Sequence, residues 1–179
     1  HMADSFDFIV VGAGIGGAAA AYWLARHGRT AIVEREAQPG YHTTGRSAAQ
    51  FITSYGPPQA RALSRASLPF FLQPPPGFAA QPLMHTRSVL AVAGPGQQAL
   101  LDEAWDAVAS VCDTGLRLDA RAVLARVPVL RADQLIGGVL EPDSWDMDVN
   151  AMHQGYLRGA RAHGAELLCD TEVLQGERV

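Results

Sequence analysis

The sequence Val10-Val11-Gly12-Ala13-Gly14-Ile15-Gly16-Gly17 decides the fold of this chain, because it joins an apolar strand to a helix through a glycine-rich turn. Residues 6–11 form an apolar, β-branched run typical of a buried parallel strand. Glycines at this spacing permit a tight turn, close approach to a pyrophosphate, and close packing of the helix on the strand. The pattern therefore predicts that a dinucleotide binds at the helix N-terminus.

An acidic residue follows at the distance that such a site requires. The run Thr30–Val33 is predicted to be a second strand, and Glu34 ends it about 20 residues beyond the glycines. A carboxylate there can accept hydrogen bonds from ribose hydroxyls and would repel the 2′-phosphate of NADP. FAD or NAD is therefore favoured. Arg35 keeps NADP open, since it is either a phosphate ligand or a solvated side chain beside the adenine.

Bulk composition excludes several other classes of protein. The chain has 179 residues, of which 48% are hydrophobic, and a formal net charge of −4. This length supports one core, or one domain with part of another, and the mild acidity does not suggest nucleic-acid binding. Neither the two cysteines nor the six histidines have metal-ligand spacing, so we expect no metal site.

The remaining pattern predicts an α/β chain with an interruption. Helices are expected over residues 17–27, 57–71, 97–111, 119–127 and 148–163, and strands over 88–93, 135–140 and 165–171. The last strand would be the third parallel strand of the nucleotide-binding sheet, about 130 residues after the second, far beyond one crossover. We therefore predict a Rossmann-like FAD-binding domain, residues 3–82 and 142–179, with an inserted α+β domain. Residues 83–141 would be part of that substrate-binding domain, and both domains would be incomplete in this chain.

Three segments carry a resemblance to a known family. They are the glycine turn, the stretch Glu34–His42 continuing through Thr44–Ala49, and His153–Gly159. The chain resembles the N-terminal half of the D-amino-acid oxidase superfamily of FAD-dependent oxidoreductases, and within it the bacterial D-arginine dehydrogenases. The glycine turn is shared by many folds, whereas the Gly45-Arg46-Ser47-Ala48 loop at this distance from Glu34 is more specific.

The resemblance implies a non-covalently bound FAD that takes a hydride from the α-carbon of a D-amino acid. The imino acid so formed would hydrolyse to a 2-oxo acid and ammonia, while the protein orients the substrate and tunes the flavin. The cofactor-binding residues implied are Gly12, Ala13, Gly14, Ile15, Gly17, Glu34, Arg35, Thr44, Gly45, Arg46, Ser47, Ala48 and Val173.

The resemblance also places residues near the substrate, with departures from the family pattern. Tyr55 matches a substrate-site tyrosine, although it could be a packing residue. Gln50 replaces a histidine at a catalytic position and cannot titrate. Ile52 replaces a hydroxyl-bearing residue, and Val89 replaces an acid that would meet a guanidinium. A buried cation needs a partner charge, so we expect a neutral or apolar D-amino acid rather than arginine.

Other functions are left open at this stage. One is oxidation of glycine, sarcosine or another secondary amine by the same chemistry. An NAD-linked dehydrogenase and a non-catalytic nucleotide-binding subunit are the others. His42 could attach flavin covalently, although an ordinary loop histidine is the simpler interpretation.

The expected partners follow from the same resemblance. They are the amino-acid substrate, an unidentified electron acceptor and a C-terminal half with the arginine that binds the substrate carboxylate. We expect this half alone to be inactive. The uncharged run from Phe8 to Ala25 indicates a buried strand and helix rather than a membrane span, because glycines fill its middle. We expect a cytoplasmic protein, either free or peripheral to the inner membrane.

Overall fold

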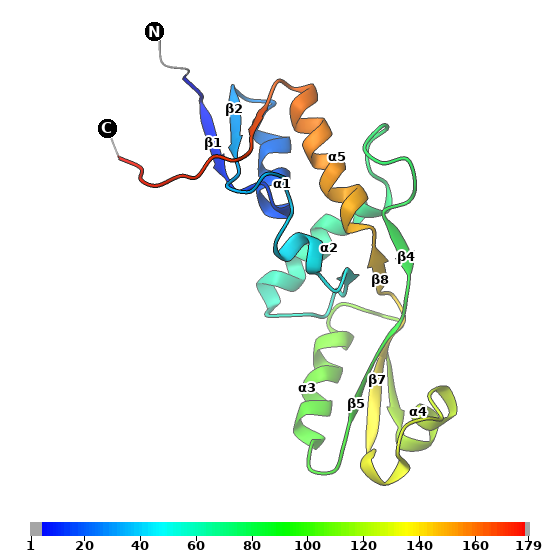
Figure 1. The fold of residues 1–179 in the computed structure, drawn as a ribbon. Helices are drawn as coiled ribbons and strands as arrows, with labels where there is room; N and C mark the ends of the chain where they lie inside the picture. Colours follow the sequence, from blue (N-terminus) through cyan, green and yellow to red (C-terminus); the bar gives the residue numbers. More distant parts are fainter. Residues whose placement is uncertain (1–4, 178–179) are drawn as a thin grey trace. The chain divides into compact units, whose positions relative to one another are not determined.

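The chain folds into two compact units, each built from separate stretches of sequence (Figure 1). The computed structural model describes residues 5–177. The first unit comprises residues 1–49, 74–83 and 148–179, and the second comprises 50–73 and 84–147. Residues 50–73 and 142–147 thus belong to the second unit, whereas the sequence grouped them with the first, and Leu83 differs in the opposite direction. The ends of the predicted domains, at residues 3–4 and 178–179, lie outside the described residues.

The first unit contains a parallel sheet of three strands in the order β1-β2-β9. These strands are β1 (Phe8–Val11), β2 (Thr30–Val33) and β9 (Glu166–Leu168). The central strand β2 is buried along its whole length, as its apolar sequence requires. In register, Ile32 lies opposite both Val10 and Leu167. The predicted third parallel strand, after a long insertion, is confirmed.

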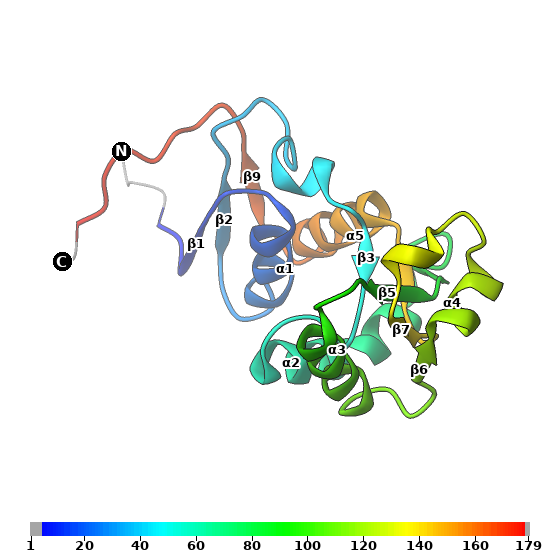
Figure 2. The ribbon, with the colours of Figure 1, turned by 90° about the horizontal axis from the view of Figure 1, so that it is seen from below.

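Two helices pack together on one side of this sheet (Figure 2). They are α1 (Ile15–Leu24) and α5 (Val149–Ala162). A Cβ atom at Gly159 of α5 would overlap the ring of Tyr22 on α1, so the absence of a side chain lets the helices approach closely. Helix α5 begins at Asp148, whose carboxylate accepts a hydrogen bond from the backbone N–H of Ala151, as predicted.

The second unit contains an antiparallel sheet in the order β5-β7-β6. The strands are β5 (Val89–Ala93), β7 (Gly137–Glu141) and β6 (Leu116–Asp119). Helix α3 (Gln98–Ala109) covers one face and α4 (Ala120–Arg126) the other (Figure 1). Neighbouring glycines on β7 show the alternation, because Gly137 faces Leu101 of α3 and Gly138 faces Val123 of α4.

A smaller antiparallel sheet and one more helix complete the second unit. The sheet pairs β8 (Trp145–Met147) with β3 (Gln50–Phe51) and β4 (Met84–Thr86). Helix α2 (Pro58–Leu72) places Phe71 against Phe51. Strands β4, β6 and β8 were not predicted, because they are three or four residues long and include charged or polar residues.

The remaining features are two short 3₁₀ turns, one proline-rich connection and the length of the helices. Short 3₁₀ turns cover Thr43–Arg46 and Ala132–Gln134. The proline-rich stretch at residues 74–77 begins where the chain leaves the second unit. Within residues 5–177, no helix is long and apolar enough to cross a membrane.

The packing of α1 on β1 predicts opposite effects for two neighbouring glycines. A Cβ atom at Gly17 would overlap the carbonyl oxygen of Gly12, whereas one at Gly16 would meet nothing within 4 Å. We expect Gly17→Ala to lower the free energy of unfolding by about 3 kcal/mol, because the backbone must shift. Gly16→Ala is the matched control and is expected to be neutral or stabilising by roughly 0.5 kcal/mol. Thermal unfolding of both variants tests this, and equal melting temperatures would contradict it.

Candidate functional site

The glycine turn lies at the carboxyl end of β1 and leads directly into α1. Gly12 has a positive φ of 92°, which residues with side chains rarely adopt. Its N–H donates to the carbonyl oxygen of Val33 at 2.7 Å, which ties the turn to the end of β2. The lack of a side chain at Gly17 allows the helix N-terminus to pack against the turn at Gly12. The backbone thus forms the strand–turn–helix arrangement that the sequence predicted.

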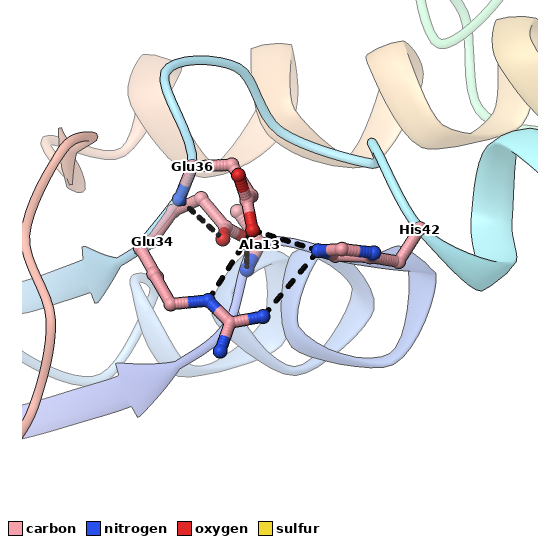
Figure 3. A network of polar contacts seen from close by, with 5 residues as sticks. Ala13, Glu34, Glu36 and His42 are labelled. Carbon is pink, nitrogen blue, oxygen red and sulfur yellow. Dashed lines mark hydrogen bonds and ion pairs between the residues drawn. The ribbon is translucent and has the colours of Figure 1, made fainter.

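Glu34 connects the end of β2 to this turn (Figure 3). One carboxylate oxygen accepts from the N–H of Ala13 at 2.8 Å, and the other accepts from the N–H of Glu36 at 3.0 Å. The N–H of Glu36, followed by those of Ala13 and Arg35, holds the pKa of Glu34 below its usual value, against the opposing effect of burial. Glu34 is therefore ionised at neutral pH, with acceptor capacity left for a ligand hydroxyl.

Next to Glu34, three side chains form a charged cluster (Figure 3). His42 Nε2 lies 2.7 Å from a Glu36 oxygen, and Arg35 Nε donates to the same oxygen at 3.2 Å. The hydrogen bond with His42 holds the pKa of Glu36 below its usual value. Because Glu36 engages Arg35, the guanidinium already has a partner within the protein. This arrangement gives no support to a 2′-phosphate at Arg35.

A groove of about 350 Å³ opens beside Glu34. The segment after β9 forms one wall, since the N–H of Thr171 donates to the carbonyl oxygen of Glu34 at 2.9 Å. The groove brings together Glu34 and Val173, the residues expected at the ribose and the adenine, although they are far apart in sequence. Its lining residues are Val11, Gly12, Val33, Glu34, Arg35, His42, Thr171, Glu172 and Val173.

The polar loop that the resemblance singled out lies at the N-terminus of α1. The Thr44 hydroxyl accepts a hydrogen bond from the N–H of Ile15 at 2.9 Å. The N–H of Gly45 donates to the carbonyl oxygen of Gly40 at 3.1 Å. Arg46, Ser47 and Ala48 follow on the exposed side of the loop. Thr44, Gly45 and Ser47 help to line a second groove of about 300 Å³ with residues of α5.

His153 is a buried residue of this site that received no role in the sequence analysis. It is 3% exposed, and its Nε2 lies 2.8 Å from the carbonyl oxygen of Ala13. Because a carbonyl only accepts, Nε2 must carry the proton. A Cβ atom at Gly40 would lie 2.9 Å from the ring of His153. The buried imidazole therefore contacts both the glycine turn, at Ala13, and the start of the polar loop, at Gly40. The sequence did contain a signal for this residue, because His153 begins the His153–Gly159 segment that carries the family resemblance.

The second unit contains a larger pocket of about 1120 Å³. It lies over the face of β5 and β7 that α3 covers, where Val89 and Ala91 are in register with Glu141 and Val139. Three of the four residues expected at the substrate line it, namely Ile52, Tyr55 and Val89. Tyr55 is 78% exposed. Gln50 is not among the lining residues; it lies on β3, in register with Asp146.

Sequence reasoning missed one acidic residue of this pocket. Glu141 is 2% exposed and lines the pocket at the end of β7. Its two carboxylate oxygens accept hydrogen bonds from Thr53 and Ser54, which lie 88 and 87 residues earlier in the chain. No local pattern indicates such a contact, because Glu141 follows an apolar strand and looks like its solvent-exposed end.

The site in the first unit fits the ADP part of a dinucleotide. The turn exposes the N-terminal backbone of α1, which suits a pyrophosphate, and side chains at Gly12 or Gly17 would disrupt that backbone. The adjoining groove presents an ionised carboxylate for hydroxyl groups. This donor and acceptor set matches an unphosphorylated ribose followed by two phosphates.

Comparison with known proteins agrees with this geometry. The family described as FAD dependent oxidoreductase, DAO, matches residues 7–179. L-α-glycerophosphate oxidase from Mycoplasma pneumoniae, solved with FAD bound, superposes with a TM-score of 0.80 at 17% identity, over 95% of this chain and 46% of that one. Glycine oxidase from Geobacillus kaustophilus gives 0.78 at 21% identity, over 94% and 47%. L-proline dehydrogenase from P. horikoshii gives 0.78 at 17% identity, over 96% and 46%.

These structural matches concern the fold, and they cover only part of each matched protein. At identities of 17–21%, they establish the fold alone. The substrates in the names of the matched proteins are those proteins' own. The chain spans about half the length of the solved proteins that it matches. FAD is the cofactor of the matching family.

The Glu34 contacts predict a loss of cofactor affinity when its charge is removed. Glu34→Gln keeps the side-chain shape but replaces one acceptor with a donor, which cannot pair with the N–H of Ala13 or of Glu36. We expect the FAD dissociation constant to rise about tenfold. Flavin fluorescence titration measures it. Glu166→Gln, an exposed carboxylate on β9 that pairs with Arg29, is the control and should leave the constant unchanged. An unaltered constant in Glu34→Gln would contradict the assignment.

Proposed function

The chain belongs to the DAO family of FAD dependent oxidoreductases, and from this premise we propose that its protein oxidises a D-amino acid at the α-carbon. Bound FAD supplies the hydride acceptor for such a reaction. The imino acid product hydrolyses to a 2-oxo acid and ammonia. The observation that carries the proposal is the pocket that gathers Ile52, Tyr55 and Val89, in a chain that also carries a dinucleotide site.

In the proposed cofactor site, the protein binds FAD through backbone and carboxylate groups. Gly12, Ala13 and Gly14, with Ile15 and Gly17 at the start of α1, would hold the pyrophosphate. Glu34 would accept from the ribose, with Arg35 and Val173 beside the adenine. Residues Thr44–Ala48 would continue along the cofactor toward the flavin. His42 lines the groove that holds Glu34 and Val173 and bonds to Glu36, which favours non-covalent flavin binding.

In the proposed substrate site, Tyr55 contributes a phenol that can hydrogen-bond to the amino acid. Ile52 and Val89 would contact its side chain. Gln50 is kept as a hydrogen-bonding residue by resemblance alone, because it lies outside the lining of this pocket. We propose that the group binding the substrate carboxylate lies outside this chain. The electron acceptor and the cytoplasmic location stay predictions from the sequence.

We propose that the part of the pocket at Val89 takes a neutral or apolar side chain. Glu141 is the acid nearest in register to Val89, and its oxygens accept four hydrogen bonds from Thr53 and Ser54. A carboxylate has about four acceptor positions, so little capacity remains for a guanidinium. A cationic substrate at Val89 would therefore find no free carboxylate in register, and the other acids that line the pocket, Asp102, Glu103 and Asp106, lie on α3 instead.

Anaerobic flavin reduction by a panel of amines tests the proposed function. We expect D-leucine, D-methionine or D-phenylalanine to bleach the flavin at least tenfold more efficiently than D-arginine, since Val89 offers a cation no partner charge. Glycine, sarcosine and L-amino acids separate the other amine-oxidising activities. Preference for D-arginine would overturn the substrate assignment, and reduction by none of these compounds would overturn the proposed function.

A single substitution should shift this preference. Val89→Glu places a carboxylate on the pocket face of β5, and we expect efficiency with D-arginine relative to D-leucine to rise about tenfold or more. Val92→Glu is the matched control, because Val92 is on the same strand but outside the pocket lining and 47% exposed. The ratio of the two kcat/KM values is the measurement. An equal rise in both variants would show a general charge effect instead.

A further inference from the structure

Glu141 is a buried carboxylate that no ion pair neutralises among the described residues. It ends β7 and lines the pocket in register with Val89. Placing a charge in such a position costs free energy unless hydrogen bonds compensate for the lost water. The partners of this carboxylate therefore indicate what it does.

All four hydrogen bonds that the Glu141 carboxylate accepts from described residues come from two consecutive residues. One oxygen accepts from the Thr53 hydroxyl at 2.9 Å, from the Thr53 N–H at 3.2 Å and from the Ser54 N–H at 3.4 Å. The other oxygen accepts from the Ser54 hydroxyl. The carboxylate thus fixes both the backbone and the side chains of one turn.

That turn carries the proposed substrate residues on both sides. Ile52 precedes it and Tyr55 follows it, and both line the pocket. The N–H of Tyr55 lies 3.4 Å from the carbonyl oxygen of Ile52, which is a weak closure for a turn. The carboxylate is therefore the stronger restraint on where these two side chains point.

We propose that Glu141 is a positioning residue, which clamps the 52–55 turn to β7 so that Tyr55 and Ile52 face the substrate. The proposal rests on the proposed function for the role of these two side chains. The carboxylate itself does not bind substrate, because its acceptor positions are occupied by the turn. An apolar residue at 141 would avoid the burial cost but would leave two N–H groups and two hydroxyls without this acceptor.

The experiment uses the FAD-loaded holoenzyme and measures the limiting rate and substrate dissociation constant of anaerobic flavin reduction by D-leucine. Glu141→Ala removes the clamp, whereas Glu141→Gln keeps an acceptor oxygen for Thr53 and can donate to the Ser54 hydroxyl. We expect Glu141→Ala to raise the dissociation constant about tenfold and Glu141→Gln to stay within about threefold of wild type. Asp133→Asn, at an exposed ion pair of the same unit, is the control for charge.

A double-mutant cycle separates positioning from general damage. If Glu141 acts through Tyr55, then Tyr55→Phe impairs the wild type but changes the Glu141→Ala enzyme less than about twofold. Independent, multiplying effects would overturn the proposal. So would a Glu141→Gln enzyme as impaired as Glu141→Ala. Should Glu141→Ala not fold, Ser54→Ala removes one bond of the clamp and must raise the same constant, and no change would overturn the proposal.

A measurement that does not depend on enzyme activity tests the clamp separately from the proposed function. If no amino acid reduces the flavin of the wild-type enzyme, the proposed function is overturned. Amide hydrogen exchange at Thr53 and Ser54 then still tests the clamp, and it should be at least about tenfold faster in Glu141→Ala than in wild type. Unchanged exchange would overturn the clamp, whatever the activity.

Discussion

The close contact between the backbone of α1 and the turn at Gly12 is the constraint on which the first unit depends. It exists because Gly17 has no side chain to separate the helix from the carbonyl oxygen of Gly12. This contact aims the helix N-terminus at the edge of the sheet, where the positive end of the helix dipole favours phosphate. The turn is also tied to β2 through Val33, so the strand and the phosphate site form together.

Electrostatics at the end of β2 follow from that arrangement. The N–H of Ala13 in the turn and the N–H of Glu36 both donate to Glu34, so the carboxylate is charged and oriented before any ligand arrives. A preoriented carboxylate saves part of the entropy cost of binding. The neighbouring pair of Glu36 and His42 holds the loop that leads to Thr44. One short stretch of chain therefore carries both the proposed ribose acceptor, Glu34, and the polar loop.

In the second unit, too, backbone N–H groups hold a carboxylate in place. Antiparallel register places Val89 and Glu141 side by side on one face of a sheet, and α3 covers that face beside them. An apolar residue and a buried carboxylate then share one pocket. The carboxylate bonds to the 53–54 turn, so its charge is compensated by dipoles rather than by a cation. The pocket stays open while the 53–54 turn in its wall is held in place.

Local patterns were enough to predict the strand, turn, helix and acid from Val10 to Glu34. Each of these depends on neighbours in sequence, such as the backbone freedom at Gly12. The family resemblance brought Tyr55 and Val89 forward, but it placed Gln50 with them, and the pocket does not. Contacts across long separations were beyond sequence reasoning. Only the tertiary structure showed Glu141 on the 53–54 turn, because strand register, rather than any local propensity, brings groups so far apart in the chain together.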